Sequence, residues 1–183
     1  MWTTQNEESW HAIYVLTGQE EKVRTALEKH FGEQLKILIP KRELRERKAG
    51  KWRLVQRKLF PGYVLVKGLL TPELYYQIKK LPMLTKILKS EEGPLKIEEK
   101  ELEVLKILIS GEDGNVGIST AFKENEKVQI TSGPLFGLEG HIQSVDARKG
   151  RAKVKLDFLG ETRIVQLGID FVDKVEKERP YDN

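Results

Sequence analysis

The sequence contains no cysteine and only three histidines, which lie far apart at positions 11, 30 and 141. The absence of cysteine excludes disulfide bonds, thiolate nucleophiles, iron–sulfur ligation and the common structural zinc sites. The scattered histidines have no spacing that is typical of a metal site. We therefore expect no metal site and no cofactor, and a chain suited to a reducing compartment.

The signatures of the common catalytic sites are also missing. The chain has no P-loop, no GxGxxG fingerprint, no HExxH pair and no GxSxG nucleophile. Its carboxylates occur in charged helical runs rather than singly in apolar stretches, where burial would shift their pKa. We predict no catalytic residue and a binding protein rather than an enzyme.

Long apolar runs are absent as well. No stretch approaches the roughly 20 residues that cross a bilayer. The first ten residues, MWTTQNEESW, are polar and lack the apolar region of a signal peptide. We expect a cytoplasmic protein without membrane contact.

Positive charge is concentrated in one segment. The chain has 183 residues and a net charge of only +4, but residues 41–58 contain nine Lys or Arg against two Glu. Such a stripe is typical of a nucleic-acid-binding surface. The alternative is a solvated hairpin that its charge keeps soluble.

The first 110 residues alternate between strand and helix patterns. Thr17 and Glu20 fit a capping box, and the helix after them places Val23, Ala26, Leu27, His30 and Phe31 on one face. His30 is therefore predicted to be a packed core histidine. Ala49-Gly50 predicts a hairpin turn. Further strands are predicted at 10–16, 35–39, 59–67 and 84–88. One further helix is predicted to start at Thr71-Pro72, and another to span 98–109. This order predicts an α+β fold around a mostly antiparallel sheet.

The pattern changes after residue 110. Residues 111–120 are rich in glycine and polar residues, which predicts a flexible linker. Beyond them, short alternating strands separated by glycine turns predict a small β-barrel. We expect a disordered N-terminus (1–9), an α+β domain (10–110), a linker (111–121), a barrel domain (122–176) and a charged tail (177–183).

One kinked segment stands at the centre of the first domain, with the sequence RKLFPGYVLV at residues 57–66. Pro61 cannot donate to a strand ladder, and Gly62 permits backbone angles that other residues avoid. The kink either presents Phe60 and Tyr63 at a surface or forms a bulge whose rings pack inward. The local sequence does not distinguish these two alternatives.

Two clusters of basic residues are candidates for nucleic-acid binding. Trp52 lies within the first cluster and can either stack on a base or cover the core. In the second cluster, alternation predicts that Lys153 and Lys155 face outward. The candidates are Lys41, Arg42, Arg45, Arg47, Lys48, Lys51, Trp52, Arg53, Arg57 and Lys58, and in the barrel Arg148, Lys149, Arg151, Lys153 and Lys155.

Two resemblances link these features. The segment EKVQITSGPLFGLEGHIQSV at residues 126–145 resembles the KOW motif of SH3-like barrels in transcription and ribosomal proteins. RKLFPGYVLV resembles the FFPGY-type strand in the N-terminal (NGN) domain of the NusG family of transcription elongation factors. Trp10, Thr17 and Gly18 match the start of that domain in order and spacing. The resemblance implies an NGN domain and a KOW barrel joined by the flexible linker.

The resemblance also implies partners and a binding site. Members of the family dock on the clamp helices of RNA polymerase and discourage pausing or termination. The matching positions, which would form the RNA polymerase-binding patch, are Trp10, Phe60, Pro61, Gly62 and Tyr63. The basic residues would contact nascent RNA or nearby DNA. For the barrel, the family implies a small-subunit ribosomal protein or the termination factor Rho as partner, and we expect a monomer.

Some residues depart from the family pattern. His11 stands where a tyrosine is usual, Leu59 replaces the first aromatic residue of FFPGY, and the hairpin is unusually basic. These departures favour a specialised paralog, similar to the processive antiterminators called LoaP. The competing hypothesis is a ribosome-associated or RNA-maturation KOW protein that binds RNA and does not bind polymerase.

Overall fold

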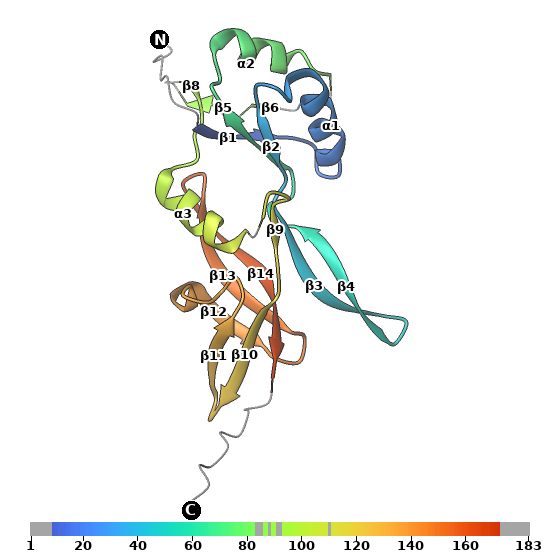
Figure 1. Ribbon diagram of the computed structural model, residues 1–183, viewed down its shortest axis with the longest axis vertical. Coiled ribbons are helices and arrows are strands. Elements are labelled where there is room, and N and C mark those ends of the chain that lie inside the picture. The colour runs from blue at the N-terminus through green and yellow to red at the C-terminus, as the bar shows by residue number, and fades with distance from the viewer. Residues whose placement is uncertain (1–8, 83–85, 88, 91–92, 110, 173–183) are drawn as a thin grey trace, which may run out of the picture.

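The computed structural model describes residues 9–82, 86–87, 89–90, 93–109 and 111–172 (Figure 1). The elements of the first part are β1 (Ser9–Tyr14), α1 (Glu20–Phe31), β2 (Lys36–Leu38), β3 (Lys41–Lys48), β4 (Lys51–Lys58), β5 (Tyr63–Gly68) and α2 (Pro72–Lys79). They are followed by β6 (Lys86–Ile87), β7 (Lys89–Ser90), β8 (Gly93–Pro94), α3 (Glu99–Leu108), β9 (Asn115–Val116), β10 (Ser119–Glu124), β11 (Lys127–Ser132), the short 3-10 helix η1 (Glu139–His141), β12 (Ile142–Asp146), β13 (Arg151–Phe158) and β14 (Glu161–Phe171). The predicted tail and nearly all of the predicted disordered N-terminus lie outside the described residues, as does part of the predicted strand 84–88.

A four-stranded sheet of order β2–β5–β1–β6 forms the centre of the N-terminal body. Val64 and Val66 of β5 point to one face, where they pack with Val23 and Leu27 of α1 and with buried residues of α2. Ala12 and Leu65 point to the other face and belong to a second cluster. The sheet is therefore covered on both faces, which explains why β5 is a continuous apolar run.

The helix ends follow local chemistry, with one correction to the prediction. In α2, the hydroxyl of Thr71 accepts from the amide of Leu74 at 3.2 Å, as the Thr-Pro pattern predicts. In α1, however, the N-cap is Gln19 without a side-chain cap, so the predicted Thr17–Glu20 capping box is wrong. A capping box is present instead in α3, between Glu98 and Glu101.

The C-terminal body is a curled sheet of five strands in the order β11–β10–β14–β13–β12. Its strongest sequence signal is the alternation of β13, and Val154, Leu156 and Phe158 are all buried there as predicted. The NGN-like and KOW-like parts together confirm the predicted α+β fold with a small β-barrel.

The segment between the two bodies is partly paired. Val116 in β9 is fully buried, and β9 pairs in parallel with β3. The carbonyl of Gly114 accepts from the amide of Lys41 at 2.9 Å. A side chain at Gly114 would lie only 2.7 Å from Leu38. The linker prediction rested on the glycine and polar residues of the segment, and this composition does not show that β3 offers it a strand edge.

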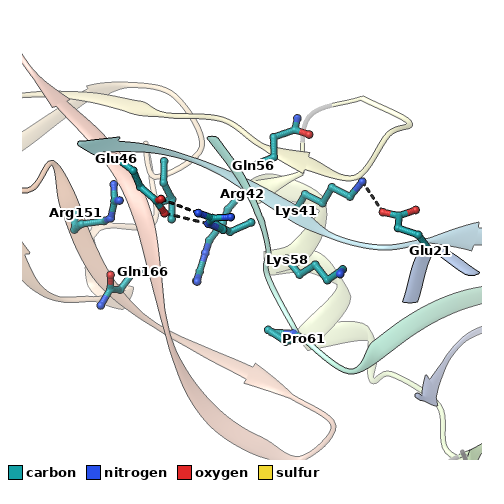
Figure 2. A pocket seen from close by; sticks show the side chains of 11 residues that line it. Glu21, Lys41, Arg42, Glu46, Gln56, Lys58, Pro61, Arg151 and Gln166 are labelled. Atoms are coloured by element: carbon teal, nitrogen blue, oxygen red, sulfur yellow. Dashed lines mark hydrogen bonds and ion pairs between the residues drawn. The ribbon is translucent and has the colours of Figure 1, made fainter. Parts of the chain in front are cut away.

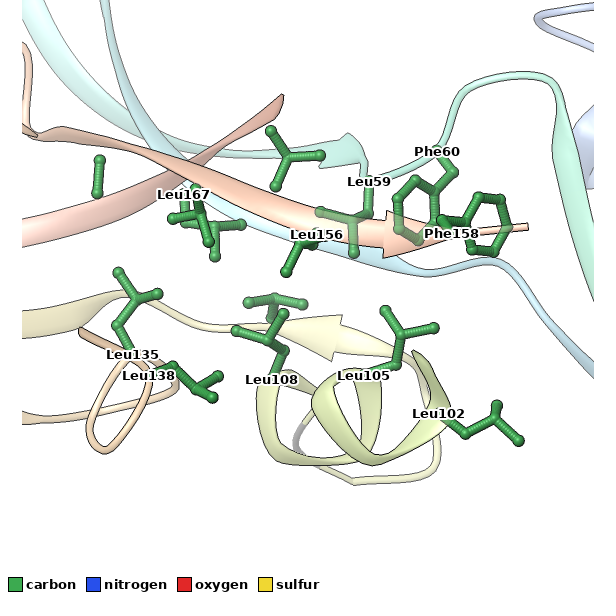
Figure 3. Close-up of a cluster of buried hydrophobic side chains, with 14 of the residues drawn as sticks. Leu59, Phe60, Leu102, Leu105, Leu108, Leu135, Leu138, Leu156, Phe158 and Leu167 are labelled. Carbon is green, nitrogen blue, oxygen red and sulfur yellow. The ribbon is translucent and has the colours of Figure 1, made fainter. Parts of the chain in front are cut away.

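Helix α3 lies between the sheet and the barrel. Its residues Leu102, Leu105 and Leu108 belong to a buried cluster that includes Leu59 and Phe158, and Figure 3 shows Leu105 and Leu108 pointing from the helix toward that cluster. The N-terminal sheet, α3 and the barrel therefore share one apolar cluster. No helix in the described part of the chain is long and apolar enough to span a membrane.

Candidate functional site: the aromatic seam and the basic hairpin

The kink predicted at Pro61-Gly62 is present between β4 and β5. Gly62 has φ of +85°, where a side chain would be strained. The carbonyl of Gly62 accepts from the amide of Val15, and the carbonyl of Pro40 accepts from the amide of Leu59, both at 2.8 Å. The kink is therefore fixed on both sides by backbone hydrogen bonds.

A buried carboxylate also holds the kink. Glu20, at the start of α1, is fully buried and accepts from the amides of Gly62 at 2.8 Å and Gly18 at 2.7 Å. Its other partner is the ammonium of Lys58 at 2.9 Å. Burial alone would raise the pKa of Glu20, but the hydrogen bonds from Gly62 and Lys58 outweigh it and place the pKa below its usual value. The sequence reasoning missed this role because Gly62 lies 42 positions away.

The two aromatic residues of the kink pack on the barrel. Phe60 is 3% exposed, and its ring stacks on that of Phe158 in β13 with centroids 4.0 Å apart and planes 2° apart. Tyr63 is half-buried and meets Phe158 edge-on at 5.4 Å. Both rings thus contact a second folded body rather than the core under α1 and α2, and only that of Phe60 is fully shielded from water.

Arg163 of β14 completes this contact. Its guanidinium carbon lies 5.1 Å from the ring centre of Tyr63 and 5.5 Å from that of Phe158. Its Nη2 donates to the hydroxyl of Tyr63 at 3.1 Å. No sequence signal identified Arg163. We call Phe60, Tyr63, Phe158 and Arg163 the aromatic seam.

Of the remaining predicted docking residues, Pro61 and Gly62 lie beside the aromatic seam, whereas Trp10 lies apart from it. Pro61 is exposed beside the seam, and Gly62 is buried. Trp10 shares the sheet face of Tyr63, but it pairs with Lys67 whereas Tyr14 pairs with Tyr63. Trp10 therefore lies about 13 Å from Tyr63 along the strand. It lines a separate pocket of about 180 Å³ next to α3.

The basic hairpin, residues 41–58, projects from the molecule beside the seam (Figure 1). Its far end carries exposed cations with the 54%-exposed ring of Trp52 among them, so this tryptophan is not a core residue. Lys41 and Lys58 instead form ion pairs with Glu21 and Glu20. The exposed basic side chains are those of Arg45, Arg47, Lys48, Lys51, Arg53 and Arg57.

The barrel lies along the hairpin at its near end. Arg45 makes a bidentate pair with Asp170 of β14 at 2.8 Å, and Nη2 of Arg151 donates to the carbonyl of Arg45 at 2.8 Å. A side chain at Gly168 would lie 2.6 Å from the carbonyl of Glu43, so glycine is needed for this approach. The barrel residues Arg148, Lys149, Lys153 and Lys155 are exposed, and within the described residues no hydrogen bond or ion pair joins them to the hairpin.

The two histidines of the N-terminal body differ in burial. His30 is exposed, so the prediction of a packed core histidine is wrong; Phe31 takes the core position of that helical turn. His11 is buried instead, at 4% exposure. Burial and the nearby charge of Lys96 lower the pKa of His11 from 6.5 to about 4. It is neutral at physiological pH.

Comparison with known proteins identifies the family. The model of the family described as transcription termination factor NusG matches residues 8–106. The transcription termination/antitermination protein NusG of Halalkalibacterium halodurans is 30% identical over 92% of this chain and 99% of its own. That of Bacillus subtilis is 29% identical over the same shares, and that of Haemophilus influenzae is 27% identical over 94% of this chain and 97% of its own.

A solved structure supports the fold of the whole chain. The structure described as domain interaction in Thermotoga maritima NusG is 25% identical, with a TM-score of 0.54 over 88% of this chain and 94% of that one. The kinked aromatic strand, the α+β body and the small barrel occur here in the order that the resemblance implied. The chain belongs to the NusG family.

Proposed function

We propose that the protein is a transcription elongation and antitermination factor that acts by binding RNA polymerase in the cytoplasm, not by catalysis. The observation that carries this proposal is the aromatic seam. Phe60 and Tyr63 form an apolar surface on the N-terminal body that requires a partner outside that body. Buried aromatic anchors of this kind dominate the energy of protein interfaces. The clamp helices of polymerase are the proposed partner.

In the closed arrangement the barrel occupies this surface. Phe158 covers Phe60, and Arg163 covers Tyr63. Polymerase and the barrel therefore compete for the same rings, and only the fraction of molecules with an open seam binds polymerase. Pro61 and Gly62 belong to the proposed patch as the rigid support of the rings, and Trp10 extends it at the other end of the sheet face.

The far end of the basic hairpin is the proposed contact with nascent RNA or DNA. It presents Arg47, Lys48, Lys51 and Arg53 around the exposed ring of Trp52. Cations that neutralise phosphates and a ring that stacks on an unpaired base suit single-stranded or looped RNA. Affinity should fall steeply with salt because bound phosphates release counterions. In the barrel, Arg148, Lys149, Lys153 and Lys155 offer a second, weaker surface for the same partner.

Three features favour a specialised paralog similar to LoaP over a general factor. They are the buried His11, the Leu59 that replaces an aromatic residue, and the cationic hairpin. Leu59 is 2% exposed and packs inside the shared apolar cluster. The docking surface therefore has two aromatic rings of this segment, Phe60 and Tyr63, and not a third. We also propose that the chain acts as a monomer and that the barrel, when released, binds Rho or a small-subunit ribosomal protein.

In vitro transcription through a terminator tests this function. The protein should increase readthrough on a subset of leader RNAs, and Tyr63→Ala should abolish both readthrough and binding to core polymerase. Because Tyr63 is half-buried, the same variant should melt a few degrees lower, so its fold is checked by circular dichroism. Tyr63→Phe keeps the ring and should keep binding. Binding of Tyr63→Ala at the wild-type level, or sedimentation with ribosomes but not polymerase, would reject the proposal in favour of a ribosomal RNA-binding role.

A further inference from the structure

A pocket of about 650 Å³ lies where the basic hairpin meets the barrel. Figure 2 shows Arg42 and Glu46 on the hairpin and Arg151 and Gln166 on the barrel around it. Helix α1 contributes Glu21 to its wall, and the kink contributes Pro61. The pocket is thus built from both bodies and adjoins the aromatic seam.

The charges of the pocket are unbalanced. Of the cations that line it, Lys41 pairs with Glu21 at 2.7 Å, and Arg57 pairs with Glu46 at 2.7 Å. Lys58 pairs with the buried Glu20. Arg42 and Arg151 also line the pocket, and among the described residues neither has a carboxylate within ion-pair distance. The carboxylate of Glu46 lies close enough to attract Arg151 electrostatically, but its ion pair is with Arg57. Neither Arg42 nor Arg151 therefore has an ion-pair partner of its own among the described residues.

These two side chains also have buried donors without acceptors. Nε of Arg42 and Nη1 of Arg151 are inaccessible to solvent and have no hydrogen-bond partner in the described part of the chain. Burial, followed by the charge of Arg151, lowers the pKa of Arg42 below its usual value. Arg151 is already oriented, because its Nη2 donates to the carbonyl of Arg45. Buried and unpaired donors of this kind are rare in folded proteins and need an explanation.

We propose that the pocket binds a phosphate group, held by Arg42 from the hairpin and Arg151 from the barrel. A phosphate supplies several acceptor oxygens and negative charge in the geometry that guanidinium groups match best. The group comes either from the backbone of RNA or from a free phosphorylated small molecule. The RNA source deepens the proposed nucleic-acid contact and rests on it, whereas the pocket itself does not depend on polymerase binding.

Occupancy of the pocket has a conformational consequence. Because Arg42 and Arg151 belong to different bodies, a phosphate between them stabilises the closed arrangement and keeps the aromatic seam covered. By reciprocity, opening of the seam weakens phosphate binding by the same factor. Anion binding in the pocket therefore controls whether the docking surface is covered by the barrel.

Titration of the full-length protein with inorganic phosphate at constant ionic strength tests the pocket. The Nε resonances of Arg42 and Arg151 should shift with saturation in nitrogen-15 spectra, and the melting temperature should rise. Arg42→Gln and Arg151→Gln should each lose both effects. Lys127→Gln, which removes one positive charge from an exposed position of β11 outside the proposed nucleic-acid surfaces, should retain them. Without phosphate, Arg42→Gln should be at least as stable as the parent, since it relieves an unpaired charge; a clear loss of stability would instead indicate a structural arginine.

A fluorescent RNA octamer distinguishes the two sources of phosphate. If RNA occupies the pocket, Arg42→Gln and Arg151→Gln should each weaken its binding by about tenfold or more relative to Lys127→Gln. If phosphate shifts both arginines but RNA affinity is equal in all three variants, the ligand is a free phosphorylated molecule. If the parent binds no RNA, the nucleic-acid proposal fails while the phosphate result still decides the pocket. Absence of a saturable shift at either arginine overturns the inference.

Discussion

Replacing Arg163 with alanine is expected to strengthen polymerase binding, although Arg163 lies in the barrel. Arg163 donates to the hydroxyl of Tyr63 at 3.1 Å and lies over the rings of Tyr63 and Phe158. The hydrogen bond contributes about 1 kcal/mol, and the partly desolvated cation–π contact about 0.5–1 kcal/mol. Loss of both weakens the closed seam by roughly 1.5 kcal/mol, which raises the open fraction about tenfold where the closed form dominates.

The assay is equilibrium binding of labelled protein to core RNA polymerase. The dissociation constant of Arg163→Ala should fall by about the same factor as the open fraction rises. Barrel stability should change little, because Arg163 is half-exposed and its other polar partner is the exposed Glu161. Arg148→Ala removes an exposed arginine of the barrel and should leave the affinity unchanged. Unchanged or weaker binding by Arg163→Ala, with a folded barrel, would refute the competition between barrel and polymerase.

The converse perturbation locks the seam. The chain has no cysteine, so Arg45→Cys and Asp170→Cys introduce the only two thiols. These residues already lie within contact of each other, and a short bis-maleimide can join them. The cross-linked protein should lose polymerase binding, and the same variant without cross-linker should keep it. Equal binding before and after cross-linking would show that the seam need not open.

Two further predictions concern the N-terminal body. The pKa of His11 is about 4 in the folded chain and 6.5 in the unfolded chain. As the pH falls below 6.5, the unfolded chain therefore binds a proton at His11 before the folded chain does, and the folded state loses stability. From pH 7 to 5 the loss is roughly 2 kcal/mol by urea denaturation, and His11→Tyr should remove this slope; an unchanged slope would show that other groups cause it. Glu20→Gln should cost about 3 kcal/mol in the same assay, because it breaks a buried pair with Lys58. Glu21→Gln, at an exposed ion pair, should cost under about 0.5 kcal/mol, and equal costs would contradict the role of burial.

Local patterns predicted the elements of the fold well. The alternation of β13 and the buried face of α1 follow directly from residue spacing, and the Thr71-Pro72 cap follows from side-chain chemistry. Spacing does not tell which residue on the flank of a helix reaches the core, and for that reason His30 was misassigned. The same limit applies to residues 115–116, whose pairing depends on a strand edge more than 60 positions earlier.

The candidate site was only partly predictable for a similar reason. The sequence identified Phe60, Tyr63 and the hairpin cations, because aromatic and charged residues are visible in one stretch of chain. It could not identify Glu20 or Arg163, whose roles arise from partners 42 and 100 positions away. It named both basic clusters as candidates without relating them in space, whereas the fold brings Arg151 of the second cluster to Arg45 of the first.

The energy of the closed arrangement resides mainly in its aromatic contacts. The pair between Arg45 and Asp170 is 49% and 37% exposed, and exposed pairs contribute little because water and salt screen them. The stack of Phe60 on Phe158, in contrast, is buried and contributes about 0.5–1.5 kcal/mol beyond its area. The rings that would anchor polymerase are thus the same rings that close the seam. A surface salt bridge cannot regulate such an equilibrium strongly, but an anion bound between Arg42 and Arg151 can, since neither guanidinium has an ion-pair partner among the described residues.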